Sequence, residues 1–444
     1  MKMQYTLKTL SALILGLGAA GVAHGAGFQL LEQNASGIGS AYAGSAAIAE
    51  DASTVYYNPA GMTMLPGMNV SAGAVAIKPS FKFSNGGTTN AAGAPVNGSD
   101  GGDAGSWAAV PNAYFTWEVN PRIWLGLGVG APFGLMTDYE EGWAGRYHSE
   151  KFSIESININ PSIAFKATDT LSLGFGVNYM HLEADYRKAQ FVPDQMGGLV
   201  PGGDLNAKVK AKGDAWGWNL GLLWQATPDT RFGLSYRSKV KIDAEGTTTV
   251  SNRNIPGTFN HPVFGPLPNP ILGAVPLGGH DAETTVELPD TAILSVVHQL
   301  NERWTLLGDV SWTGWSSIPE LKIENTGAPN STLDLRFKDA WRVALGAHYR
   351  YSDAWTFKGG VAWDQSPVRD DAYRPSSLPD NDRYWVSLGA QYRFNKNTKV
   401  DVGYAHLFVK STSVNNASSK EAGVLKGDYK SSADIIGVQF SHQF

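Results

Sequence analysis

The side chains that could do chemistry most directly are two adjacent cations, Arg187 and Lys188, where a strand-like segment gives way to an apolar loop. A cationic group beside an apolar surface suits a ligand with a carboxylate at one end and hydrocarbon at the other. Solvation at the base of a loop is the alternative for both cations.

Two long loops are rich in apolar residues but have neither strand nor helix periodicity. Contiguous apolar loops favour a groove for a hydrophobic ligand. Packing of the loops against each other as a lid is the alternative, and the two interpretations are compatible. The apolar loop residues that we expect to contact a ligand are Phe191, Leu199, Phe264 and Leu267.

The elements that must position these groups are strands that alternate between an apolar and a polar face. In the last strand, apolar residues recur at every second position up to Phe444, with His442 as the polar exception. The same period runs through residues 171–179, 341–349 and 384–394. Many long strands of this kind indicate a sheet closed on itself in a membrane rather than a water-soluble core.

The strand pattern continues to the end of the chain. About fourteen such strands can be placed, an even number, as expected for a bacterial single-chain barrel. Tight turns rich in Asn, Asp and Pro alternate with long segments such as 187–208 and 245–283. Short turns belong on the periplasmic side and long loops outside. We therefore predict an all-β fold, an antiparallel transmembrane β-barrel over residues 67–444.

The composition agrees with a barrel. The charged fraction is 17%, which is below the roughly 25% usual for soluble domains. The mean hydropathy of -0.19 is too polar for a bundle of membrane helices but fits strands that have one wet face. A net charge of -5 gives no reason to expect nucleic acid as a partner. The absence of cysteine excludes disulfides and thiolate metal sites, and we expect no cofactor and no metal.

Residues 1–25 have the pattern of a secretory signal peptide. Two lysines precede an apolar stretch over residues 10–20 that is too short to span a bilayer. Ala23-His24-Gly25 is a small-x-small cleavage site, so we expect Ala26 to be the first mature residue. An uncleaved anchor is the alternative.

Residues 26–66 lack strand alternation and consist largely of small residues. Short helices broken by glycine are expected there. Small residues allow the close backbone packing that a plug inside a barrel requires, so we predict a plug, called the hatch below. A flexible exported N-terminus is the alternative.

The third strand contains alternate glycines from Gly126 to Gly130, followed by Ala131-Pro132-Phe133-Gly134. Proline cannot donate to a β-ladder and glycine weakens one. We predict a kink there, and in a barrel wall the lost pairing makes a side opening. A strand that simply ends at the outer rim is the alternative.

Several motifs resemble one family. The N-terminal ones are residues 26–30 (AGFQL), 37–39 (GIG), 41–44 (AYAG), 47–52 (AIAEDA) and 58–60 (NPA). Together they resemble the mature N-terminus of the long-chain fatty acid transporters of Gram-negative outer membranes, the FadL/TodX type. Shorter matches, among them residues 110–112, 236–243, 337–340 and 380–385, extend the resemblance over essentially the whole mature chain.

The resemblance implies a hatch inside a fourteen-stranded barrel, with the Asn-Pro-Ala motif of the hatch at Asn58, Pro59 and Ala60. It implies a side opening at 131–134, with Ala108 on the neighbouring strand.

The resemblance also implies contacts for the ligand. It makes the two apolar loops an outer capture groove and Phe28 of the N-terminal motif a ligand contact. It places the family's basic pocket residue at Lys188, next to Arg187. Leu333 stands where the family has a second lysine.

On this resemblance, the chain is an outer-membrane channel for passive uptake of long-chain fatty acids or similar hydrophobic molecules. The ligand is captured at the outer loops, passes to a lumen pocket and leaves sideways into outer-membrane lipid, and we expect a monomer. The first alternative is a channel for aromatic or other hydrocarbons, and the second a general diffusion porin. A barrel lipase or protease is disfavoured because no Gly-x-Ser-x-Gly elbow stands on a strand-to-helix turn, so we expect no enzyme.

Overall fold

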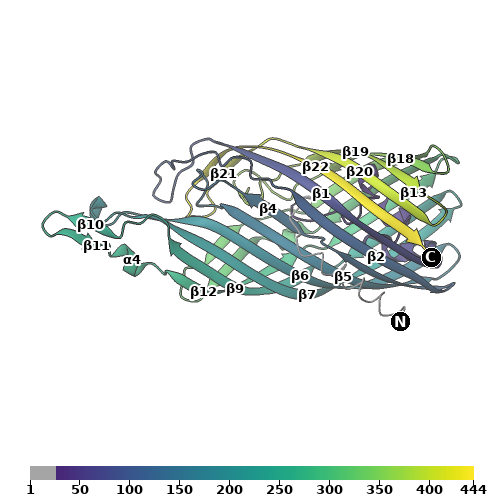
Figure 1. Cartoon of the computed structure of the whole chain (residues 1–444), viewed down its shortest axis with the longest axis horizontal. Coiled ribbons are helices and arrows are strands. Elements are labelled where there is room, and N and C mark those ends of the chain that lie inside the picture. Colours follow the sequence, from purple (N-terminus) through teal and green to yellow (C-terminus); the bar gives the residue numbers. More distant parts are fainter. Residues whose placement is uncertain (1–26) are drawn as a thin grey trace.

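The computed structural model describes residues 27–444, and strands dominate it (Figure 1). The predicted signal peptide, residues 1–25, lies outside the described residues. All wall strands join one antiparallel sheet that closes into a barrel of 14 strands, which confirms the predicted fold class. Within the described residues, no helix is long and apolar enough to cross a membrane.

Eight wall strands run without a break. They are β1 (Met68–Asn85), β2 (Ala108–Asn120), β5 (Lys151–Lys166), β6 (Leu171–Val192), β7 (Gly203–Thr227), β18 (Trp355–Asp364), β19 (Arg383–Arg393) and β22 (Leu425–Gln443).

The other six wall strands are interrupted. They are β3 (Ile123–Gly130) with β4 (Gly134–Asp138), β8 (Thr230–Arg237) with β9 (Val240–Asn252), β12 (Gly278–Leu288) with β13 (Thr291–Gln299), β14 (Trp304–Thr313) with β15 (Glu320–Asn325), β16 (Ser331–Asp334) with β17 (Ala340–Arg350), and β20 (Thr398–Val409) with β21 (Thr412–Asn416).

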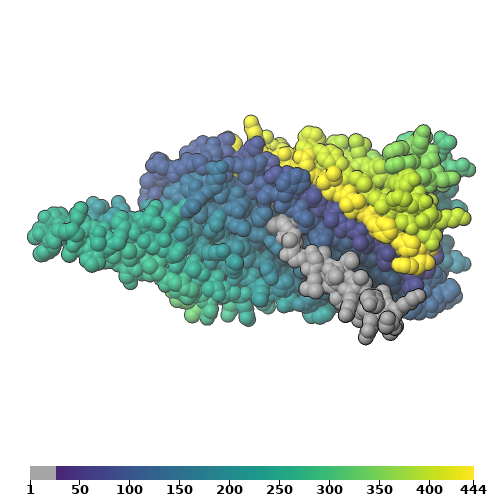
Figure 2. All heavy atoms as spheres, viewed as in Figure 1, coloured from purple at the N-terminus to yellow at the C-terminus, as the bar shows by residue number. Residues whose placement is uncertain are grey.

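The barrel closes where the last strand meets the first. β22 pairs with β1 from Gln443 opposite Asn69 to Gly427 opposite Asn85. Figure 2 shows the C-terminal strand lying beside the N-terminal strands on the surface. A closed sheet leaves no unpaired edge in the hydrocarbon, which is the condition for a strand protein to span a membrane.

The two faces of each strand meet different surroundings. In β22, Ile436, Val438 and Phe440 point outward with about half of their side-chain surface exposed, whereas Gln439 points into the lumen and is fully buried. Since the exposed face is the apolar one, the pattern is that of a wall between lipid and a polar interior.

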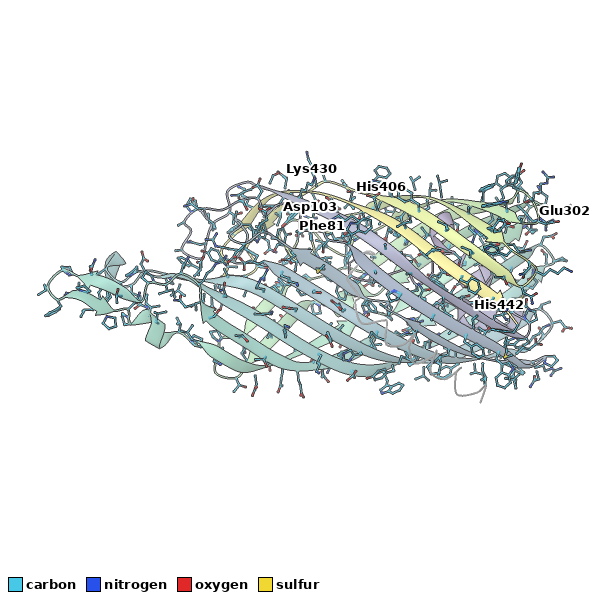
Figure 3. The ribbon with its side chains drawn as sticks, in the orientation of Figure 1. Phe81, Asp103, Glu302, His406, Lys430 and His442 are labelled. Atoms are coloured by element: carbon cyan, nitrogen blue, oxygen red, sulfur yellow. The ribbon has the colours of Figure 1, made fainter. Side chains whose placement is uncertain are left out.

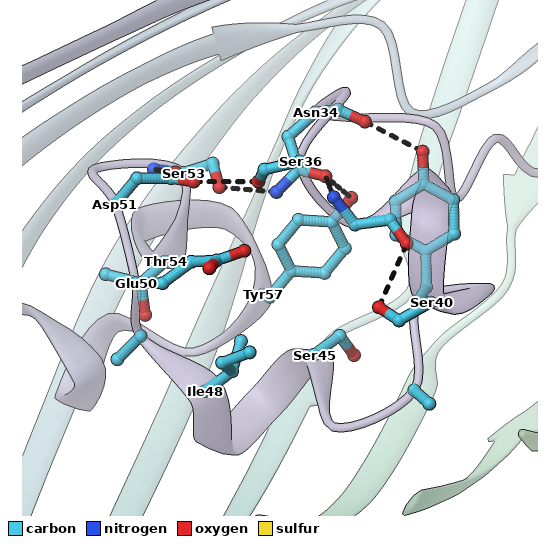
Figure 4. A pocket seen from close by; sticks show the side chains of 14 residues that line it. Asn34, Ser36, Ser40, Ser45, Ile48, Glu50, Asp51, Ser53, Thr54 and Tyr57 are labelled. Carbon is cyan, nitrogen blue, oxygen red and sulfur yellow. Dashed lines mark hydrogen bonds between the residues drawn. The ribbon is translucent and has the colours of Figure 1, made fainter. Parts of the chain in front are cut away.

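The hatch is a chain of four short helices inside the lumen: η1 (Ile38–Ser40), α2 (Ser45–Ile48), α3 (Thr54–Tyr57) and η2 (Pro59–Met64). Its side chains also bond each other, for example Ser36 Oγ to Asp51 at 2.7 Å and Asn34 Nδ2 to Ser53 Oγ at 2.6 Å (Figure 4). These bonds replace the long-range packing that such short helices cannot provide themselves.

The outer ends of β6, β7, β9 and β12 extend into a projection at one end of the barrel (Figure 1). At its tip lie a hairpin of β10 (Thr258–His261) and β11 (Gly265–Pro268) and the one-turn helix α4 (Ile271–Ala274), and η3 (Met196–Gly198) lies in the shorter loop. The prediction of long loops over residues 187–208 and 245–283 was therefore wrong in part. β6 runs to Val192 and β7 begins at Gly203, while β9 runs to Asn252, β10 pairs with β11, and β12 begins at Gly278. The hairpin forms because Gly265, with a φ of 73°, takes the left-handed conformation that ends its tight turn.

Candidate functional site

The third wall strand is broken where the sequence predicted a kink. β3 ends at Gly130 and β4 begins at Gly134. β3 pairs with β5 up to Gly130 opposite Asn158, and β4 resumes with Gly134 opposite Glu155. Three residues of the kinked strand therefore face two of β5, which is the geometry of a bulge. Pro132 sits inside it, where its missing N–H breaks no ladder bond.

The kink also ends the pairing with the strand on the other side. The β2–β3 ladder stops at Ala113 opposite Val129. The outer part of β2, from Asn112 to Ala108, continues its ladder only with β1, where Ala108 lies opposite Ile77. Ala108 and Ala131 thus flank the place where the wall has lost ladder pairing.

The start of the hatch pairs with the kink from inside the barrel. The Leu30 N–H donates to the Pro132 carbonyl at 2.8 Å, and the Gly134 N–H donates to the Phe28 carbonyl at 2.9 Å. Gln29 and Phe133 form a bridge between these bonds. The first hatch residues therefore act as a short inner strand for the interrupted wall strand.

The side chain of Gln33 completes this pairing. Its Nε2 donates to the Ala131 carbonyl at 2.8 Å, and its Oε1 accepts from the Ala131 N–H at 3.1 Å. The Gln33 carbonyl accepts from the Tyr114 hydroxyl of β2 at 2.7 Å. A Cβ at Gly130 would lie 2.4 Å from Gln33 Oε1, so the glycine there makes room for the amide.

A buried apolar cluster rises from the kink toward the outer loops. At its base, Phe28 packs against Phe133 and Trp315, with ring centroids 6.0 and 4.8 Å apart. At its top, Leu333 and Tyr186 pack against it as partly buried residues. Between them lie Leu135, Phe152, Ile154, Met180, Leu182, Ile242, Val286, Leu288, Leu335 and Phe337. The lumen above the hatch is therefore a continuous apolar region.

Lys188 stands at the top of this cluster. It lines two neighbouring cavities of about 20 and 30 Å³, and its Nζ donates to Ser331 Oγ at 3.0 Å. His148 and Leu333 line the smaller cavity with it. Burial, with the nearby Lys188 charge, lowers the pKa of His148 to about 3, so this histidine is neutral. Each cavity has room for about one water molecule, so a long ligand must displace side chains to bind.

Arg187 points the other way, as successive residues in a strand must. Its guanidinium lies 3.3 Å from Asp138 and 3.9 Å from Glu150, and it lines neither of the two cavities. The structure therefore separates the two cations that the sequence placed together. Only Lys188 faces the lumen.

The predicted loop residues do not share one surface. Phe191 lies with its ring 5.9 Å from Tyr147, in a cluster near the Lys188 cavities. Leu199 and Leu267 are half-buried, whereas Phe264 is 72% exposed at the hairpin tip. The two loops pack on each other through a cluster that includes Val200 and Ile271.

The Asn-Pro-Ala motif joins the hatch to the wall. Asn58 is fully buried, and its Nδ2 donates to the Ala46 carbonyl at 2.6 Å and to the Leu222 carbonyl of β7 at 2.9 Å. Its Oδ1 accepts from the Ala60 N–H at 3.0 Å, which holds the turn at Pro59. A Cβ at Gly221 would lie 2.0 Å from Asn58 Oδ1, so only glycine lets the motif lie this close.

Ion pairs also hold the hatch in the lumen. Lys358 of β18 lies 2.7 Å from Glu50 of the hatch and 2.9 Å from Asp401 of β20, and it donates to the Ser36 carbonyl at 3.0 Å. Further wall cations bond hatch carbonyls: Arg342 to Ala41, Arg231 to Ile48 and Arg237 to Tyr56.

The sequence singled out neither Gln33, Ser331, His148 nor Lys358. Gln33 lies within the family-like N-terminal segment, but nothing in its neighbours marks it as the partner of the kink. Ser331 and Lys358 gain their roles only through contacts that are distant in sequence. Ser331 bonds Lys188, 143 positions away, and Lys358 bonds Glu50, 308 positions away. His148 gains its role because it lines the smaller cavity with Lys188.

A closed barrel with an apolar lumen above an internal hatch that is bonded to the wall, and with a kinked third wall strand beside the hatch, defines a class of outer-membrane transport barrels. The comparison with family models agrees: residues 16–444 match the model described as outer membrane protein transport protein (OMPP1/FadL/TodX). The chain belongs to this family. Its members are transport channels of the outer membrane and not enzymes, so the predicted location and the absence of catalysis are confirmed.

Among curated relatives, the chain is 33% identical over 468 residues to the long-chain fatty acid transport protein of Escherichia coli, covering 99% of this chain and 100% of that protein. It is 32% identical over 450 residues to the 47 kDa outer membrane protein of Pasteurella multocida, covering 98% of each. Among solved structures, it is similar to a FadL homologue of Pseudomonas aeruginosa, with a TM-score of 0.85 and 25% identity over 94% of this chain and 100% of that chain.

Proposed function

We propose that the protein is a passive channel that takes up long-chain fatty acids or similar hydrophobic molecules. The ligand meets the apolar outer loops, enters the lumen near Lys188, passes down the apolar cluster to Phe28 and leaves sideways between Ala108 and Ala131. The similarity to the Escherichia coli long-chain fatty acid transport protein supports this substrate class.

One observation carries the proposal. The apolar cluster is continuous from Leu333 and Tyr186, beside Lys188, to Phe28 and Phe133 at the kink. A hydrocarbon chain would stay out of water along this path, and each methylene kept dry is worth about 0.8 kcal/mol. Lys188 at the top is the one lysine that lines both cavities, so it is placed to meet a carboxylate.

The hatch favours a sideways exit. Lys358, Arg342, Arg231 and Arg237 each bond the hatch from the wall, so a path straight down the lumen would require many buried bonds to break. The side path requires the loss of only the few bonds between residues 28–33 and the kink.

The chain closes its own barrel, so we propose that it works as a monomer within outer-membrane lipid.

The test of this function is uptake together with the retained ligand. The purified protein should carry a fatty acid that mass spectrometry identifies, and proteoliposomes should take up oleate. Ala131→Arg should block uptake while the barrel stays folded, because the charged side chain fills the proposed exit. Ala354→Arg, in a periplasmic turn, is the matched control. Normal oleate uptake by the folded Ala131→Arg protein would contradict the route, and the absence of any bound or transported fatty acid would contradict the substrate.

A second candidate is a channel for aromatic or other hydrocarbons. Leu333 favours it, because this apolar side chain lines the same cavity as Lys188 where the family resemblance places a second lysine. A hydrocarbon needs no charged partner. Toluene uptake that exceeds oleate uptake by the same protein would support this candidate.

A further inference from the structure

The same group of three side chains, a tyrosine, a histidine and an aspartate, occurs twice on neighbouring strands of the barrel wall. On β6 and β7, the Tyr179 hydroxyl and His181 Nδ1 both contact Asp214, at 2.6 and 2.7 Å. On β20 and β22, the Tyr404 hydroxyl and His406 Nδ1 contact Asp434 in the same way, at 2.7 and 2.8 Å. In each case two residues of one strand, separated by one position, share a carboxylate of the next strand.

Both groups mark the outer border of the hydrocarbon. On the periplasmic side of Asp434, the outward residues are Ile436, Val438 and Phe440, all strongly exposed. On the loop side, the outward residues of β1 are lysines and serines, and those of β22 are lysines, a serine and Asp428. Since polar groups replace apolar ones at this level, the lipid headgroups of the outer leaflet begin here.

Above this border, two lysines stand opposite each other on neighbouring strands. Lys82 of β1 lies directly opposite Lys430 of β22, and both point outward and are exposed. Like charges in directly opposite positions repel and destabilise a sheet. Within residues 27–444, neither ammonium has a carboxylate within 4.0 Å. Figure 3 shows Lys430 and His406 on this side of the barrel.

Two carboxylates near the lysine pair, Asp103 and Asp434, already have partners. Asp103 accepts from Ser80 Oγ at 2.7 Å, from the Phe81 N–H at 2.8 Å and from the Gly105 N–H at 3.1 Å. Asp434 is shared by Tyr404 and His406. Asp428 is the next outward residue above Lys430, opposite Ser84.

Two lysines on the opposite side of the barrel differ. Lys208 lies 3.7 Å from Asp185, and Lys241 lies 3.8 Å from Asp243. Each of these two cations has a carboxylate of the wall beside it. The unpaired cations of β1 and β22 therefore favour an anion that comes from outside the protein.

We propose that Lys82 and Lys430 bind the phosphate of an anionic lipid of the outer leaflet, whose acyl chains lie on Ile436, Val438 and Phe440. The pair stands four residues above Asp434, roughly 13 Å along the strand, and the strand tilt reduces this height to roughly 10 Å. The flexible stem of a lysine side chain lets its ammonium bend toward a headgroup. Lys78, opposite Asp434, is not part of the pair, because its Nζ donates to the Gly105 carbonyl at 2.9 Å.

The experiment measures lipid retained by the full-length mature protein in neutral detergent, by native mass spectrometry with dioleoyl phosphatidic acid. Each lysine that contacts an anionic headgroup contributes roughly five-fold to binding. Lys82→Ser with Lys430→Ser should therefore weaken retention roughly twenty-five-fold, whereas Lys208→Ser with Lys241→Ser should change it less than two-fold. Phosphatidylcholine with the same chains should bind equally weakly to all three proteins.

A second variant guards against misfolding. Lys430→Glu should raise the thermal midpoint in lipid-free detergent, because it turns a repulsive pair into an attractive one, and should still weaken phosphatidic acid binding. Equal loss of lipid in both double variants, or a Lys430→Glu protein that is less stable, would overturn the proposal. Competition by millimolar inorganic phosphate would assign the site to free phosphate, and equal loss of oleate would assign it to a carboxylate; both would overturn the lipid assignment.

Discussion

The amide of Gln33 bonds both backbone groups of Ala131, its Nε2 to the carbonyl at 2.8 Å and its Oε1 to the N–H at 3.1 Å. A hatch side chain thus takes the place of the ladder partner that β2 no longer offers at the kink. The bond pair links the start of the hatch to a wall strand whose ladder is broken on both sides.

Gln33→Ala should loosen this link. Two backbone groups of Ala131 would lose their partner, and a typical hydrogen bond contributes about 1 kcal/mol. Amide hydrogen exchange should show protection of Ala131 and Leu30 lowered by roughly ten-fold. Gln225→Ala is the control, because that amide also bonds backbone carbonyls but in a periplasmic turn. Unchanged protection at Ala131 would show that the backbone bonds of Leu30 and Gly134 suffice.

Lys188→Met should weaken binding of oleate much more than binding of toluene. A hydrogen bond to a charged group contributes about 1.5–3 kcal/mol, which corresponds to roughly a ten- to hundred-fold loss of oleate affinity. Arg187→Met is the control, since Arg187 lies on the other face of the strand with Asp138. A larger loss in the Arg187 variant, or equal losses for both ligands, would place the carboxylate elsewhere.

Deletion of Asn58 to Ala60 should impair ligand transfer and leave the barrel folded. The deletion removes the bonds of Asn58 to Ala46 and Leu222, whereas the wall ladders do not involve these residues. Heat-modifiable migration on a gel checks the barrel, and uptake into proteoliposomes checks transfer. Asn58→Asp is a second variant with a smaller change. It keeps the Oδ1 contact with the Ala60 N–H but loses the Nδ2 donor to Ala46 and Leu222. Normal uptake by a folded deletion protein would exclude the motif from the pathway.

Docking of the hatch should depend on pH through Glu32. This carboxyl is fully buried, and neither oxygen has a hydrogen-bond partner among the described residues. Burial raises its pKa from 4.5 to about 8. The docked state therefore holds a proton that an undocked, solvated Glu32 would release. Docking should be strongest below pH 4.5, weaken up to about pH 8 and then level off.

Hydrogen exchange of the hatch amides, corrected for intrinsic rates, measures this dependence. Glu32→Gln should remove it, because the amide stays neutral at every pH. A Glu32→Gln protein that keeps the same pH dependence would assign the effect to another group.

The sequence by itself determined the barrel, the hatch and the position of the kink. These features are local: the two-residue period follows from the pleat, the small residues of 26–66 exclude strands, and Pro132 cannot join a ladder. The motif Asn58-Pro59-Ala60 is local too, since Asn58 holds its own turn.

Only the tertiary structure decided which groups meet. It turned Arg187 and Lys188 to opposite faces, because neighbouring side chains in a strand point to opposite sides. The sequence did not predict this, because the two residues stand where the alternating pattern gives way to a loop. It brought Gln33 to Ala131, Lys358 to Glu50 and Lys82 to Lys430, pairs that lie 98, 308 and 348 positions apart. Such pairs depend on barrel closure and strand register, which sum over all strands and leave no mark on the residues near either partner.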